Sequence, residues 1–226
     1  MSLADSPHIL VAFKKSRWQH YTEGSADGES LGDGSRPVDT EELEEAHRIH
    51  RRAVEKVCDH LRAGGWSFDA HYRGDVEETE QYDLIITIGG DGTVLDLSHR
   101  VTDVPILGVN SHPGSSVGYF CAGIVDEFDA LLTEALSGEL ETFSLARFQV
   151  EVNGEPTGPP VLNDFLLAHE NPAAVSRYVL TVGEGPSESH RSSGLWVATP
   201  AGSTAAIRSA GGMVLPLAAR SLEYLV

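Results

Sequence analysis

The stretch DLIITIGGDGT, residues 83–93, decides the fold of this chain. Its first part, Asp83 to Ile88, is apolar and rich in β-branched residues, which predicts a buried β-strand. Two glycines follow at once, and we expect a helix from there through Arg100. Glycines let the backbone turn tightly and bring its N–H groups close to phosphate oxygens. In a parallel sheet such a loop lies beyond the carboxyl end of its strand, where ligands bind.

The segments on either side alternate in the same way, as in a parallel sheet covered on both faces. The apolar runs predict strands, and helices are expected from a cap at Asp39-Thr40 to Gly64-Gly65 and over Asp126–Leu136. Within the first helix, His47 and His50 are predicted on a solvated face, with no third metal ligand. The predicted strands are His8–Phe13, Trp66–Tyr72 and Pro105–Asn110. The predicted polar connections are Lys14–Asp39, a long mobile loop, and Asp75–Gln81, which is acidic and exposed.

After Glu141 the pattern changes to short strand-like segments separated by turns such as Asn153-Gly154. The fold class is therefore an α/β N-terminal domain with a parallel sheet, residues 1–143, followed by a β-rich C-terminal domain, residues 144–226. We expect the active site between the two domains. The predicted strands of the second domain are Phe148–Val152, Val161–Ala168, Tyr178–Val182 and Leu195–Thr199.

Composition excludes several classes of function. A formal net charge of −18 argues against a protein that binds nucleic acid or an anionic membrane surface. The two cysteines, Cys58 and Cys121, have no C-x-x-C spacing, so neither a disulfide framework nor a zinc site is expected. Met1 to Ile9 lacks the pattern of a secretory signal, and no apolar run reaches the ~20 residues that span a bilayer. We therefore expect a cytoplasmic protein.

Asp91 stands in the middle of the glycine loop, where a carboxylate would repel phosphate. It is useful there as a base toward a hydroxyl group, or through a magnesium ion. The alternative is an ordinary strand-to-helix turn in which Asp91 caps the helix.

Two further motifs lie in the C-terminal part. Asn163-Asp164, within LNDF, can hydrogen-bond a ribose diol or adenine nitrogens, although the pair alone also suits a turn. A second run, GLWVATPAGSTA at residues 194–205, leads from a strand into a turn of small residues, and Ser209 to Gly212 (SAGG) follows. Small residues allow the backbone to approach a flat nucleotide closely, and a tight turn with a closely packed helix is the alternative.

The glycine motif resembles that of the superfamily of NAD kinases, diacylglycerol kinases and phosphofructokinases. In this order the three motifs, from Asp83 to Pro216, resemble the NAD kinase family. The resemblance implies phosphorylation of the 2′-hydroxyl of the adenosine ribose of NAD to give NADP. It also implies Mg²⁺ with ATP, or polyphosphate, as phosphate donor, and a homo-oligomer, a dimer or a tetramer.

By position, the resemblance makes Asp91 the catalytic base. The residues that it assigns to substrate binding are Gly90, Gly92, Thr93, Asn163, Asp164, Arg177, Arg191, Ser193, Thr204, Ala205, Ala206 and Ser209.

The chain departs from the family pattern at three places. Ser193 stands where the family has Asp, Ala206 stands where it has Tyr, and the turn at residues 109–118 is longer than usual. The longer turn and the Ser-Ser-Gly at residues 192–194 are similar to those of a divergent branch that includes mitochondrial NAD kinases of animals. The family's β domain also continues beyond Leu225-Val226, so we expect residues 144–226 to be incomplete at the C-terminus.

Two other functions stay open at this point. A lipid or sphingoid-base kinase of the same superfamily shares the glycine loop but needs an apolar pocket for an acyl chain. A non-catalytic NAD-binding protein is the second alternative, favoured by Ser193 and Ala206.

Overall fold

The computed structural model describes residues 6–23, 39–171 and 173–226. The chain divides into two compact units, Met1–Glu141 and Thr142–Val226. The predicted mobile loop at residues 14–39 falls partly outside the described residues. Its first part is helical, since α1 covers Arg17–Glu23, so the loop prediction was wrong there.

The N-terminal unit is built on a five-stranded sheet in which every pair of neighbouring strands is parallel. The order of the strands is β2-β1-β3-β4-β5, so β3 lies in the centre. All six residues of β3 are buried, as the apolar run predicted. The strands are β1 (His8–Phe13), β2 (Ser67–Tyr72), β3 (Leu84–Gly89), β4 (Ile106–Asn110) and β5 (Gly123–Ile124).

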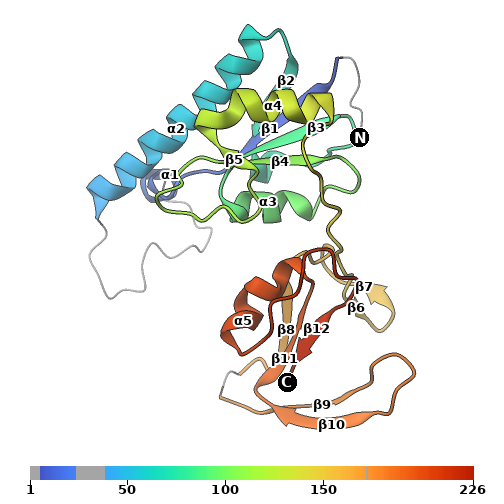
Figure 1. The fold of residues 1–226 in the computed structure, drawn as a ribbon. Helices are drawn as coiled ribbons and strands as arrows, with labels where there is room; N and C mark the ends of the chain where they lie inside the picture. The colour runs from blue at the N-terminus through green and yellow to red at the C-terminus, as the bar shows by residue number, and fades with distance from the viewer. Residues whose placement is uncertain (1–5, 24–38, 172) are drawn as a thin grey trace. The chain divides into compact units, whose positions relative to one another are not determined.

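Helices cover both faces of this sheet (Figure 1), which confirms the predicted α/β class. On one face, α2 (Thr40–Ala63) and α4 (Phe128–Ser137) pack over Ile9 and Val11 of β1. On the other face, α3 (Asp91–Ser98) packs over the residues that alternate with them, Leu10 and Ala12. Two short 3₁₀ turns, η1 (Arg73–Asp75) and η2 (Val125–Glu127), follow β2 and β5.

The C-terminal unit is made of antiparallel strands, as the turn-rich sequence predicted. β8 (Asp164–Ala168) and β12 (Glu223–Leu225) flank β11 (Gly194–Ala198). The predicted turn at Asn153-Gly154 has positive φ angles of 55° and 83°, the geometry of a tight hairpin turn. The other elements are β6 (Glu151–Val152), β7 (Glu155–Pro156), β9 (Ser176–Leu180), β10 (Glu188–Ser192), η3 (Ala201–Thr204) and α5 (Ala206–Ser209).

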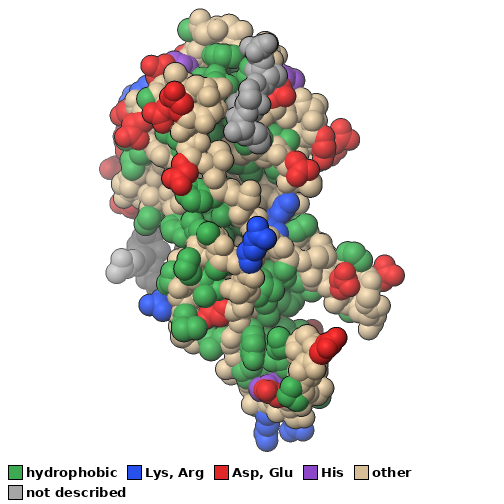
Figure 2. Space-filling model, turned by 45° about the vertical axis from the view of Figure 1, so that its right-hand side comes forward, with side chains coloured by type: hydrophobic (Ala, Val, Ile, Leu, Met, Phe, Trp, Pro, Cys, Tyr) green, Lys and Arg blue, Asp and Glu red, His purple; other side chains and the backbone are tan. Residues whose placement is uncertain are grey.

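On the face shown in Figure 2, acidic side chains are scattered over the upper part, and hydrophobic side chains gather in the lower half. The exposed hydrophobic residues of the C-terminal unit include Leu166, Leu167, Val179 and Met213. Among the described residues, no helix is both long enough and apolar enough to span a membrane.

The segment Asp75–Gln81 is exposed at five of its seven residues, including all of its acidic ones, as predicted, and Val76 and Thr79 are buried. The exposure prediction for His50 was wrong. His50 is only 3% exposed and lies on the face of α2 that also buries Ala53 and Val57. It packs there because it is three residues before Ala53, in register with the apolar stripe of the helix.

The buried His50 ring makes two hydrogen bonds. Its Nε2 lies 2.9 Å from the carbonyl oxygen of Lys14, which can only accept, so Nε2 carries the proton. Its Nδ1 lies 3.0 Å from the hydroxyl of Ser111, which therefore donates to it. The Ser111 N–H in turn donates to the carbonyl of Gly89, at 2.9 Å. His50 thus ties together the carboxyl ends of β1, β3 and β4.

The pKa of His50 is lowered from 6.5 to about 4, mainly because the ring is buried. The hydrogen bond to the Lys14 carbonyl opposes this shift, and the nearby charges of Lys14, His47 and Arg51 contribute to it. The unfolded chain binds a proton at His50 near pH 6.5, but the folded chain does so only near pH 4. Between these values the unfolded state holds more protons, so the free energy of unfolding falls as the pH falls, by about 1.4 kcal/mol per pH unit.

We predict that His50→Gln removes this part of the pH dependence, because glutamine does not titrate. Between pH 7 and pH 4.5, its free energy of unfolding should fall by about 2–3 kcal/mol less than that of the unmodified chain. The measurement is urea unfolding followed by tryptophan fluorescence, to which Trp66 contributes from its place against the core. The exposed His99→Gln serves as control. An equal pH dependence in His50→Gln and the unmodified chain would contradict the prediction.

Candidate active site

The glycine loop lies at the carboxyl end of the central strand β3, where the sequence placed it. Gly90 is the N-cap of α3, and it lies close to the loop after β4. A Cβ atom on Gly90 would stand 2.4 Å from the hydroxyl oxygen of Ser116, so the Ser116 side chain would have to move to admit one. Thr93 is buried on the first turn of α3.

Asp91 is the first residue of α3, but its side chain does not cap this helix. Its Oδ1 accepts a hydrogen bond of 2.8 Å from the backbone N–H of Phe120, in the loop after β4. The cap alternative was therefore wrong. The carboxylate is half-buried and held in one orientation, and among the described residues no donor contacts its second oxygen, Oδ2. Such an oxygen can accept a proton from a ligand.

The longer turn after β4 is organised by Asn110, which is buried at the end of that strand. Its side-chain oxygen accepts from the N–H of His112 at 3.0 Å, and its amide donates to the carbonyl of Ser116 at 2.9 Å. Gly118, with φ of 68°, packs directly against the same amide. Asn110 thereby sets the path of the chain toward Phe120, the residue that holds Asp91.

Cys121 follows Phe120 and is half-buried. Burial raises the pKa of its thiol to about 11, and the negative charge of Asp91 raises it as well. The thiol is therefore protonated and neutral beside the carboxylate.

A third contact to the loop comes from Arg73, which the sequence analysis did not single out. Its Nη1 donates to the carbonyl of Gly92 at 2.8 Å, and its Nε lies 3.7 Å from Oδ2 of Asp96. Asp96 also pairs with Arg100 at 3.1 Å. The signal that was available is an arginine directly after a predicted strand, at the carboxyl edge of the sheet.

In the C-terminal unit, the second and third sequence motifs pack against each other. The N–H of Thr199 donates to the carbonyl of Asn163 at 3.2 Å, and the Thr199 hydroxyl bonds the carbonyl of Leu162. Asp164 accepts the N–H of Ile207 through Oδ2 at 2.8 Å. A Cβ atom on Gly202 would lie 1.9 Å from the Asn163 oxygen, so only glycine permits this contact.

These contacts bring several predicted substrate-binding residues into one cluster. Asn163 and Asp164 stand beside the segment from η3 to α5. The predicted residues on that segment are Thr204, Ala205, Ala206 and Ser209; Ala205 is half-buried and the other three are exposed.

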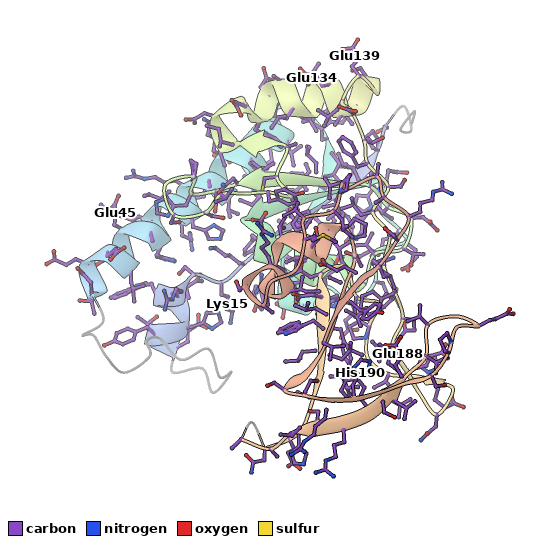
Figure 3. All side chains as sticks on the ribbon, turned by 60° about the horizontal axis from the view of Figure 1, so that its bottom comes forward. Lys15, Glu45, Glu134, Glu139, Glu188 and His190 are labelled. Atoms are coloured by element: carbon purple, nitrogen blue, oxygen red, sulfur yellow. The ribbon has the colours of Figure 1, made fainter. Side chains whose placement is uncertain are left out.

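Arg177 and Arg191 lie opposite each other on the β9–β10 hairpin. This hairpin is a two-stranded sheet of its own, distinct from the sheet that contains β8 and Asp164. Both arginine side chains are exposed. Two like charges directly across a strand pair repel each other, so an anion placed between them would relieve the repulsion. On the same hairpin, Figure 3 shows Glu188 and His190; Oε2 of Glu188 lies 3.4 Å from Nε2 of His190, and the His190 ring stacks on Tyr178.

Ser193 borders a cavity of about 490 Å³ in the C-terminal unit. The cavity is lined by apolar side chains such as Trp196 and by small residues that include Ala210 of the SAGG motif. Its full lining is Leu166, Ser192, Ser193, Gly194, Trp196, Ala210, Leu225 and Val226.

The described residues contain no group of three or more His, Cys, Asp or Glu side chains that could hold a metal ion. Mg²⁺ does not require such a group, because it keeps several waters and commonly binds through substrate phosphates with one or two carboxylates.

Comparisons with known proteins agree with the motifs. Residues 22–140, more than half of the 226 residues, match the ATP-NAD kinase N-terminal domain family. A probable NADH kinase of Oryza sativa subsp. japonica is 35% identical over 206 residues, which cover 81% of this chain and 63% of that protein. An NAD kinase of Methanoculleus marisnigri is 37% identical over 171 residues, which cover 74% of this chain and 57% of that protein.

The fold is also similar to that of a solved NAD kinase. The crystal structure of the enzyme from Archaeoglobus fulgidus in complex with ATP superposes with a TM-score of 0.62 at 22% identity, covering 96% of this chain and 71% of that one. The chain spans less than two thirds of the length of the rice and archaeal relatives. With this family match and these motifs, the chain belongs to the NAD kinase family.

Proposed function

We propose that this chain carries the phosphotransfer site of an NAD kinase, which transfers the terminal phosphoryl group of ATP to the 2′-hydroxyl of the adenosine ribose of NAD. The observation that supports this most is the geometry of Asp91. Its carboxylate stands at the carboxyl edge of the sheet, oriented by the Phe120 N–H, with Oδ2 directed to no described protein donor.

In this proposal Asp91 accepts the proton of the 2′-hydroxyl as the ribose oxygen attacks the terminal phosphorus. A bond forms between the ribose oxygen and phosphorus, the bond from phosphorus to the bridging oxygen breaks, and ADP leaves. The N–H groups at the start of α3 and the glycine loop orient the phosphates. Most of the acceleration comes from positioning and charge stabilisation, as in phosphoryl transfer generally. When bound, Mg²⁺ would neutralise negative charge on the donor phosphates.

On the acceptor side, the cluster in the C-terminal unit supports a role in holding NAD. Asp164 uses Oδ2 for the Ile207 N–H, and its other oxygen can accept from a ribose hydroxyl. The small residues Ala205 and Ala206 allow a nucleotide to approach the backbone. Arg177, Arg191 and Ser193 are proposed as further contacts to the substrate. Membership of the NAD kinase family favours this function over a lipid or sphingoid-base kinase.

The relatives differ in acceptor, since the rice protein is named a probable NADH kinase and the archaeal protein an NAD kinase. The activity test therefore supplies NAD and NADH separately, each with ATP or polyphosphate and Mg²⁺, and measures NADP or NADPH. ATP is the proposed donor, because a protein of similar fold has been crystallised with ATP.

The homo-oligomeric state, the cytoplasmic location and the meeting of the two clusters in one site stay predictions.

We predict that Asp91→Asn lowers the rate of NADP formation by roughly 10²–10⁴-fold, the usual contribution of a general base. The fold should be retained, because the asparagine oxygen can still accept the Phe120 N–H. Steady-state kinetics with NAD and ATP measure the rate, and thermal unfolding checks the fold. Asp126→Asn is the matched control, since Asp126 is an exposed carboxylate paired with Lys56. Near-full activity of Asp91→Asn would remove this residue from its role.

We predict that Asp164→Asn raises the KM for NAD by about ten-fold or more, because one charge-assisted hydrogen bond to the ribose is lost. The KM for ATP should stay within about two-fold of the unmodified value. The asparagine can keep the bond to the Ile207 N–H, so the segment after Pro200 should remain in place. Glu188→Gln, on the β9–β10 hairpin, is the control. An unchanged KM for NAD in Asp164→Asn would refute the assignment.

A further inference from the structure

Arg73 reaches the glycine loop from a distant strand. It belongs to η1, directly after β2, and β1 lies between β2 and β3 in the sheet. Two neighbouring strands are about 4.8 Å apart, so the arginine bridges about 10 Å to reach Gly92. Its Nη1 donates to the Gly92 carbonyl at 2.8 Å, which places the guanidinium beside the residue that follows Asp91.

Arg73 shares its acidic partner with a second arginine. Asp96 lies 3.7 Å from Arg73 and 3.1 Å from Arg100, so its single charge is divided between the two guanidinium groups. The Arg73 side chain is 24% exposed, so solvent reaches part of it. A guanidinium also has five N–H donors, and the contacts to Gly92 and Asp96 use only some of them.

We propose that Arg73 is a further phosphate-binding residue, which contacts the polyphosphate part of the phosphate donor at the glycine loop. The inference rests on the proposed function, since it assigns the donor to this loop. Arginine suits the role because its planar fork can bond phosphate oxygens while other N–H groups stay on Gly92 and Asp96. The bond to Gly92 then holds the guanidinium at a fixed position relative to the loop.

The test measures binding of the donor directly. Isothermal titration of the unmodified chain, Arg73→Gln, Arg73→Lys and Arg100→Gln uses three probes: ATP with Mg²⁺, inorganic tripolyphosphate and NAD. Glutamine can keep a hydrogen bond to the Gly92 carbonyl but has no charge. We expect Arg73→Gln to weaken the binding of ATP and of tripolyphosphate by roughly 10- to 100-fold. Arg73→Lys should lose less, and the affinity for NAD should not change.

Arg100→Gln is the matched control, because Arg100 pairs with the same carboxylate but makes no contact with the loop in the described part of the chain. Its affinity for ATP should stay within about two-fold of the unmodified value. The inference is overturned if Arg73→Gln binds ATP normally, if Arg100→Gln loses as much affinity, or if the unmodified chain binds neither ATP nor tripolyphosphate.

Failure of the inference and failure of the proposed function give different results. Donor binding that depends on Arg73, without any NADP or NADPH formed, would reject the function and keep the inference. NADP formation with an unchanged KM for ATP in Arg73→Gln would keep the function and reject the inference.

Discussion

The structure of the N-terminal unit depends on the complete burial of its central strand. β3 is covered on both faces, by α2 and α4 on one side and by α3 on the other. A buried polar side chain in such a strand is costly unless it is hydrogen-bonded. The charged and polar groups of the candidate site therefore lie where the strand ends. That point is the glycine loop with Asp91, and the neighbouring strands deliver their own polar residues to the same edge.

Three chain segments then fix the loop from different directions. Phe120 holds the carboxylate of Asp91, Arg73 holds the carbonyl of Gly92, and Ser111 holds the carbonyl of Gly89. Each of these contacts involves a backbone group, and in the described part of the chain Oδ2 of Asp91 is left without a protein donor. A preorganised arrangement of this kind lowers the cost of binding and of phosphoryl transfer.

Much of the fold could be predicted because its signals are local. The apolar run before Gly89, the cap at Asp39 and the Asn153-Gly154 turn each act within a few residues, and the structure confirms them. β10 was missed because its sequence, ESHRS, has no apolar alternation and pairs only through its partner β9. His50 was misplaced because histidine is usually exposed, although its register with Ala53 and Val57 indicated the buried face. The family, too, could be identified from the motifs.

The contacts that orient the candidate site were harder to foresee. The hydrogen bond from Phe120 to Asp91 uses a backbone N–H 29 residues away. Every residue except proline has such an N–H, so the residue type does not indicate this contact. Arg73 acts across an intervening strand, so only the strand order reveals its target. The roles of the individual substrate-binding residues therefore stay predictions, whereas the elements that carry them are established.

Cys121 gives the site one more property. With a pKa of about 11, its thiol is ionised in only about one molecule in ten thousand at neutral pH. Alkylating reagents and peroxides attack the thiolate form, so the sulfur beside Asp91 is protected by its surroundings from the covalent damage that commonly disables cysteine-containing enzymes. Burial is the main cause of this low reactivity, and the negative charge of Asp91 adds to it.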